Sequence, residues 1–132
     1  MVLENPEPYR IRSSQGGPHR NLARVVCGHL QSAWAKPVRD HNRRAFDATR
    51  ALMGEPTGSI VLDAGCGDGS STRDLAQWHP EALVVGVDKS AHRLSRAAAA
   101  PVRDGRVILV RADLVDFWRL ARDAGWRLAH HY

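Results

Sequence analysis

The chain has 132 residues, of which 43% are hydrophobic and 25% are charged. This length and balance are typical of one soluble globular domain, and they exclude a chain that is disordered throughout. Nineteen basic residues against fourteen acidic ones give a formal charge of +5, so the surface either binds an anionic partner such as RNA or is a solvated, Arg-rich surface.

Residues 1–19 contain three prolines and two glycines among polar residues, which predicts a flexible N-terminal arm. Acidic residues and prolines stand where a signal peptide would carry a basic and then an apolar segment. No apolar run in the chain reaches the length of a membrane-spanning helix. We therefore expect a cytoplasmic protein with no membrane partner.

Residues 20–57 are predicted to form a helical region that precedes the main domain. From Asn21, apolar residues recur at spacings of three and four until Pro37, which is the pattern of an amphipathic helix. His29 lies on the apolar side of this helix. A buried, hydrogen-bonded histidine is the preferred interpretation there, with a catalytic or ligand-binding role as the alternative.

A second helix is predicted from about residue 38 to residue 53, with Gly54 placed to end it. One face of it carries Phe46, Thr49, Leu52 and Met53, and the other face carries Arg39, Arg43, Arg44 and Arg50. The arginine face either contacts RNA, with tRNA as the possible partner, or is a solvated charged face.

After Gly54 the hydrophobic pattern changes to short runs of β-branched residues. Residues 60–65, 82–88 and 106–113 are predicted strands that are covered on both faces, and a helix is predicted after each of them. Ser70 or Ser71 and then Ser90 are placed to cap the first two of these helices. Residues 126–132 begin a fourth apolar run. Residues 58–132 are therefore predicted to form an α/β domain with a partial doubly wound, Rossmann-like parallel sheet.

The first strand leads into a glycine-rich turn, "VLDAGCGDGSS", at residues 61–71. Its spacing is GxGxG rather than the dinucleotide pattern GxGxxG, and no lysine follows as it would in a phosphate-binding loop. The carboxylates of Asp63 and Asp68 disfavour a pyrophosphate and favour a ligand with an amino group or a sulfonium. The turn is therefore predicted to bind a cationic ligand.

Two further carboxylates stand at the ends of the next two predicted strands. Asp88 is placed to accept hydrogen bonds from both ribose hydroxyls, and Asp113 is placed to accept one from an adenine amine. Each acid taken alone is explained equally well as a helix N-cap or a turn residue. The coincidence of Asp63, Asp88 and Asp113 with the glycine turn favours a nucleoside-binding site.

The segments "VLDAGCGDGSS", "VVGVDKS" and "VRADL" resemble the cofactor-binding half of class I S-adenosylmethionine-dependent methyltransferases, over about residues 58–132. The resemblance implies that S-adenosyl-L-methionine is the cofactor and that the protein is an enzyme. Gly65 and Gly67 would then pass under the methionine part, and Asp63 would help to hold its amino group through water or neighbouring backbone. By the same resemblance, Asp88 would bind the ribose, and Ala112 with Asp113 would border the adenine.

Within that superfamily the sequence is most similar to tRNA (guanine-N7-)-methyltransferases. The similar features are His79–Pro80, an alanine–acid pair after the third strand and a basic N-terminal region. The resemblance implies methyl transfer to guanine N7 in tRNA, an acceptor with a free lone pair that requires no strong base. The alternatives are a methyltransferase with a small-molecule acceptor and a truncated, non-catalytic domain that binds the cofactor or a partner.

Two features depart from that family. Asp63 and Cys66 stand where its members often have Glu and a bulky residue, and no Asp-Pro-Trp-Pro segment occurs before Tyr132. We therefore expect a domain that is incomplete at its C-terminus, with the catalytic residues beyond Tyr132.

The two cysteines, Cys27 and Cys66, show neither zinc-ligand spacing nor a disulfide framework, so no metal is predicted. For Cys66 a packing role is preferred over a nucleophilic one, because no activating base is in view. Phe117 and Trp118 are predicted to pack in the core.

Overall fold

The computed structural model describes residues 16–32, 36–55 and 58–132, and the chain divides into two compact units, residues 1–36 and 37–132. The predicted arm falls mainly on residues 1–15, outside the described residues.

In the first unit, helix α1 (Leu22–Gln31) has no buried residue. His29 is exposed, so the prediction of a buried histidine is wrong. The described part of this unit contains no second element against which the apolar side of α1 can pack.

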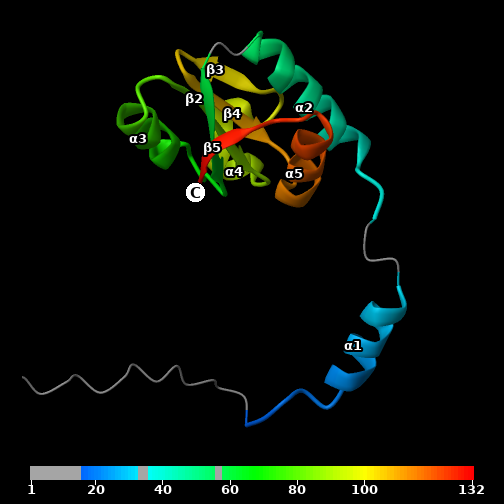
Figure 1. The fold of residues 1–132 in the computed structure, drawn as a ribbon. Helices are drawn as coiled ribbons and strands as arrows, with labels where there is room; N and C mark the ends of the chain where they lie inside the picture. The colour runs from blue at the N-terminus through cyan, green and yellow to red at the C-terminus, as the bar shows by residue number, and fades with distance from the viewer. Residues whose placement is uncertain (1–15, 33–35, 56–57) are drawn as a thin grey trace, which may run out of the picture. The chain divides into compact units, whose positions relative to one another are not determined.

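The second unit begins with a helix and continues as alternating strands and helices (Figure 1). Its elements are α2 (Asp40–Met53), β1 (Ser59–Ala64), α3 (Ser70–Trp78), β2 (Ala82–Asp88), α4 (Ala91–Leu94), η1 (Ser95–Ala97), β3 (Val102–Asp104), β4 (Val107–Arg111), α5 (Leu114–Asp123) and β5 (Leu128–His131). Helix α2 belongs to the same unit as the sheet, whereas the sequence grouped it with α1 in residues 20–57.

The strands form one sheet in the order β3-β4-β2-β1-β5. All neighbouring pairs are parallel except the β3–β4 pair, which is antiparallel. The predicted α/β fold with a largely parallel, doubly wound sheet is confirmed. The chain moves from β1 outward to β2 and β4, and then returns to the other side of β1 as β5. The order of the strands therefore reverses at β1, which is where such sheets bind ligands.

Helices cover both faces of the sheet (Figure 1). Helices α2 and α5 pack on one face through a core that includes Phe46, Leu62 and Phe117. Helix α3 with α4 and η1 packs on the other face, around Val61, Leu75 and Leu94. Because apolar groups are removed from water on both sides, the central strands read as continuous apolar runs.

The segment between β2 and β4 differs from the prediction of one helix. It forms the short α4 and η1 and then β3, which turns back onto β4 at Gly105, where φ is +57°. The alanine run at 97–100 was read as helix because alanine favours helices. Pro101 has no amide hydrogen to continue that helix, and the chain becomes extended at β3.

Two local predictions are corrected and one is confirmed. The N-cap of α3 is Gly69 and not Ser70 or Ser71. Trp118 is 39% exposed and contacts His131 edge-on, although its neighbour Phe117 is buried as predicted. Ser90 caps α4, and its hydroxyl accepts a hydrogen bond from the Arg93 amide.

Two negative findings concern the described residues alone. None of their helices combines the length and the apolar composition needed to cross a membrane. Within the same ranges, no three His, Cys, Asp or Glu side chains are grouped so that they could hold a metal ion.

Substitution of Phe117 tests the packing of the core between the sheet and helices α2 and α5. Phe117 is fully buried and meets the ring of Phe46 edge-on at 5.2 Å between centroids. We expect Phe117→Ala to lower the free energy of unfolding by about 3–5 kcal/mol, measured by urea denaturation, because it leaves a cavity. On the same helix, Val115 is 53% exposed. The control Val115→Ala is therefore expected to cost about 0.5 kcal/mol or less, and equal losses for the two variants would contradict the packing.

Candidate functional site

The glycine turn leaves the carboxyl end of β1 and enters α3. All three of its glycines have positive φ angles, +81° at Gly65, +58° at Gly67 and +88° at Gly69. At Gly69 an added Cβ would also lie 2.6 Å from a methyl group of Leu109, so a side chain there would strain the backbone and displace Leu109. At Gly65 and Gly67 an added Cβ would meet nothing within 4 Å. The space beside these two glycines is open, and a ligand can approach the backbone there.

Asp88 connects this turn to the end of β2. Its Oδ2 accepts a hydrogen bond of 3.0 Å from the Gly67 amide, and its Oδ1 accepts one of 2.7 Å from the Ser90 amide. The carboxylate is buried and lies 3.8 Å from the guanidinium of Arg93. A carboxylate has about four lone-pair sites, so Asp88 keeps acceptor capacity for further donors such as ribose hydroxyls.

Asp63 is buried at the end of β1 and is bonded to the start of α3. Its Oδ2 accepts hydrogen bonds from the Ser71 hydroxyl at 2.7 Å and the Thr72 hydroxyl at 2.8 Å. The sequence assigned Ser71 to helix capping, but its hydroxyl is used to hold Asp63. Through these bonds Asp63 fixes the first turn of α3 relative to β1, which sets the path of the glycine turn.

Ala112 and Asp113 follow β4 at the same edge of the sheet. The Ala112 amide donates to the Asp88 carbonyl oxygen at 3.1 Å, so the ends of β2 and β4 are held together. Asp113 is exposed and is also the N-cap of α5, since its Oδ1 accepts from the Asp116 amide at 3.1 Å. Its capping role and a ligand role are therefore compatible, because the second carboxylate oxygen is not needed for the cap.

A hydrogen-bond network attaches α2 to this edge. The buried Asn42 donates to Asp116 Oδ2 at 2.7 Å and accepts from the Asp113 amide at 3.0 Å. The Arg39 amide also donates to Asp116 Oδ2, at 3.1 Å. Burial of Asp116 opposes its ionisation, but the hydrogen bonds from the Arg39 amide and the Asn42 side chain outweigh burial and hold its pKa below the usual value. The charged Asp116 therefore fixes the start of α2 beside Asp113.

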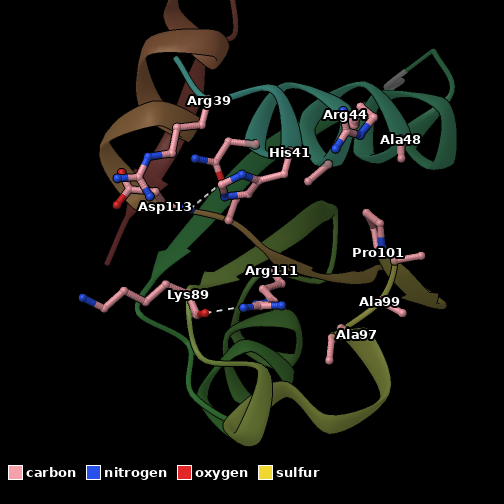
Figure 2. A pocket seen from close by; sticks show the side chains of 15 residues that line it. Arg39, His41, Arg44, Ala48, Lys89, Ala97, Ala99, Pro101, Arg111 and Asp113 are labelled. Carbon is pink, nitrogen blue, oxygen red and sulfur yellow. Dashed lines mark hydrogen bonds between the residues drawn. The ribbon is translucent and has the colours of Figure 1, made fainter. Parts of the chain in front are cut away.

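A cavity of about 730 Å³ lies between α2, residues 97–101 and the ends of β2 and β4 (Figure 2). Of the predicted site residues, it contains Ala112 and Asp113. Gly67, Asp88 and Ala112 are joined by direct hydrogen bonds, and Gly65 donates to the Val87 carbonyl oxygen. The structure thus brings the predicted residues to one edge of the sheet, with Asp63 buried at the end of β1.

The sequence pointed to some residues of the cavity, Arg39 and Arg44 among them, but not to Asn42 and Asp116, which position α2, or to Lys89 and Arg111 in the lining. Asn42 shares a helical face with Phe46, Thr49 and Met53, and a polar residue on a buried face is a signal that a hydrogen-bond partner exists. Lys89 and Arg111 line the cavity and are joined by a bond from Arg111 Nε to the Lys89 carbonyl oxygen. Nothing in the sequence indicated their shared position.

The fold and the glycine turn are those of an α/β domain with a predicted nucleoside site, and comparison with known proteins specifies its family. A model described as "Methyltransferase domain" matches residues 61–126, and the chain belongs to this family. It is a class I methyltransferase domain, for which S-adenosylmethionine is the implied methyl donor.

Two curated relatives and one solved structure illustrate the similarity. Trans-aconitate 2-methyltransferase of Deinococcus radiodurans is 46% identical over 70 residues, which are 53% of this chain and 24% of that protein. The 16S rRNA (adenine(1408)-N(1))-methyltransferase of Streptoalloteichus hindustanus is 36% identical over 74 residues, 53% of this chain and 33% of that protein. The antibiotic-resistance methyltransferase Kmr matches with a TM-score of 0.38 at 22% identity, over 52% of this chain and 37% of that structure. The chain spans about a quarter to a third of the curated relatives.

The residues present fit S-adenosylmethionine. Open space beside Gly65 and Gly67 admits a ligand to the backbone, and the surrounding carboxylates, Asp63, Asp68 and Asp88, match its positive charge. Asp68 is exposed, and hydrogen bonding from the Ser70 amide lowers the pKa of its carboxyl group. The roles of individual residues toward the cofactor stay predictions from the resemblance.

The structure makes a prediction about the two thiols. Burial, followed by the nearby Asp63 carboxylate, raises the pKa of Cys66 to about 12, whereas Cys27 is exposed. Because the thiolate is the reactive form, we expect one fast-reacting thiol per folded chain in a titration with a chromogenic disulfide at mild alkaline pH, and two after unfolding. Cys27→Ser is expected to remove the fast reaction. A fast reaction that persists in Cys27→Ser would contradict the burial of Cys66.

Proposed function

We propose that this chain forms the cofactor-binding part of an S-adenosylmethionine-dependent methyltransferase and that its acceptor is a base in RNA. The observation that carries the first half is the continuous set of contacts at one sheet edge. The Gly67 amide donates a hydrogen bond to the Asp88 side chain, and the Ala112 amide donates one to the Asp88 carbonyl oxygen. The space beside Gly65 and Gly67 is open. The positive α2 surface carries the second half.

When bound, the cofactor supplies a methyl group on a positively charged sulfur. The acceptor would attack the methyl carbon in line, and the sulfur would leave as a neutral thioether. The contribution of this chain is to bind and orient the cofactor. Asp88 would hold the ribose and Asp113 with Ala112 would border the adenine, which fixes the cofactor at two points along its length. Such positioning converts an encounter of two molecules into a reaction within one complex, which can supply about 7–11 kcal/mol of a barrier.

The finer prediction, guanine N7 in tRNA, is supported by the sequence features and not by the names of the relatives. His79 is the C-cap of α3, and its Nε2 is hydrogen-bonded to the Tyr132 hydroxyl at 3.0 Å. One relative is named for an adenine of 16S rRNA. We therefore propose an RNA base as the acceptor class and keep guanine N7 of tRNA as its sequence-based member.

A small-molecule acceptor is the second candidate. It is favoured by the 46% identity to a relative named for trans-aconitate, which is a small polyanion. The basic side chains around the α2 cavity suit either acceptor, so binding experiments must separate the two.

Calorimetry with S-adenosylmethionine, NAD and ATP tests the cofactor. We expect heat with S-adenosylmethionine, and Asp88→Ala should weaken that binding by about tenfold or more because hydrogen bonds to a charged acceptor are lost. The matched control is Asp74→Ala, an exposed acid on α3, which should bind as the wild type does.

The outcomes separate two errors. Heat with NAD or ATP and none with S-adenosylmethionine would overturn the proposed function. Unchanged affinity in Asp88→Ala, with a normal thermal melt, would leave the cofactor in place but refute the ribose assignment.

A further inference from the structure

The cavity beside α2 is lined by more positive charge than the cofactor can use. Four side chains around it are cationic, those of Arg39, Arg44, Lys89 and Arg111, and Asp113 supplies the one carboxylate in its lining. We call this set the α2 basic cavity. Figure 2 shows Lys89 and Arg111, from the ends of β2 and β4, across the cavity from His41 and Arg44 of α2.

Among the described residues, most of these cations form no ion pair with a carboxylate. In the described ranges, the ion pairs join Arg93 to Asp88, Arg119 to Asp116 and Arg122 to Asp123. Arg39 interacts with the charge of Asp116. Arg111 donates its Nε to the Lys89 carbonyl oxygen at 3.2 Å, which orients the guanidinium and leaves its terminal nitrogens for a ligand. The cavity is thus prepared for an anion.

This charge is opposite to that of the glycine turn. The carboxylates near the turn, Asp63, Asp68 and Asp88, suit a sulfonium and are partly offset by Arg73 and Arg93. In the cavity the cations are in clear excess, and they raise the energy of a positively charged ligand. S-adenosylmethionine carries no phosphate to compensate for them. The α2 basic cavity is therefore suited to a different ligand, one that lies next to the adenine side of the cofactor site, where Ala112 and Asp113 form the common border.

Two further arginines of α2 lie outside the cavity, and one of them, Arg50, lines a second cavity together with Asp47 and Glu55. Arg43 and Arg50 are exposed on this helix, and from Arg43 to Arg50 it rises about 10 Å. Asp40 and Asp47, both exposed on α2, reduce the charge locally but leave arginine in excess. Positive groups spread over this length match a row of anions better than a single one, and the arginine fork can bind a phosphate through two parallel hydrogen bonds.

We propose that the α2 basic cavity binds the phosphodiester backbone of an RNA strand. Arg44 and Arg111 hold a phosphate inside the cavity, and Arg43 and Arg50 contact the strand outside it. This rests on the proposed function only in taking the RNA as the methyl acceptor, because RNA binding by the cavity does not require the cofactor.

The test is the affinity of the full chain for a short fluorescein-labelled RNA hairpin, measured by anisotropy over a range of salt. In the double variant Arg44→Gln/Arg111→Gln we expect binding about tenfold weaker and a log–log salt slope smaller by about one, because the two arginines hold the same phosphate. The control Arg122→Gln removes an exposed arginine of α5 that is paired with Asp123, and it should leave the affinity and the slope unchanged.

Calorimetry with S-adenosylmethionine on the same variants separates this proposal from the proposed function. In the double variant, normal cofactor binding with weakened RNA binding supports the cavity as a second site. If the unmodified chain binds no S-adenosylmethionine but binds RNA, and the double variant weakens that RNA binding, the cavity is supported and the proposed function is overturned. The inference is wrong if the double variant, with a normal thermal melt, binds RNA as Arg122→Gln does. It is also wrong if the double variant loses cofactor affinity to the same degree, or if the ligand that it loses is trans-aconitate and not RNA.

Discussion

The hydrogen bond from the Gly67 amide to Asp88 is the contact on which the site depends. It joins the turn after β1 to the end of β2, and the bond from the Ala112 amide to the Asp88 carbonyl oxygen extends the connection to β4. Asp63 supports it by binding two hydroxyls of α3. Because parallel strands end at one edge, these few bonds are enough to bring residues 46 positions apart, Gly67 and Asp113, to the same site.

A second constraint, the charged Asp116, places α2 against this edge. Asn42 and the Arg39 amide both donate to its carboxylate, so the arginines at the start of α2 are held where the strands end. As a result, two neighbouring surfaces, the glycine turn and the α2 basic cavity, differ in the sign of their charge. Carboxylates near the glycine turn outnumber its two arginines, Arg73 and Arg93, whereas cations dominate the α2 basic cavity. In the proposed function, this difference in charge would direct the cationic cofactor and an anionic acceptor to neighbouring but different surfaces.

Much of this could be predicted from the sequence where the signal was local. Strands β1, β2 and β4 followed from β-branched apolar runs, and the glycine turn and Asp88 followed from their positions after such runs. The features that the sequence did not predict depend on contacts between distant residues or on competition between weak local preferences. Asn42 and Asp116 are 74 positions apart, and no local pattern indicates that they meet. The alanines after η1 favoured a helix by propensity, but the hairpin of β3 with β4 decided the structure there. His29 and Trp118 were read as buried because their spacing is helical, and spacing alone does not show which side chains find a packing partner.

The most direct test of the central claim, that the edge formed by Gly65, Gly67, Asp88 and Ala112 holds S-adenosylmethionine, is a titration followed by amide NMR shifts. We expect the largest shifts at Gly65, Gly67, Lys89 and Ala112, with Ser59 and Gly125 at the opposite edge unaffected. Saturable binding with its largest shifts at that opposite edge, or the absence of shifts from the glycine turn at saturation, would contradict the assignment.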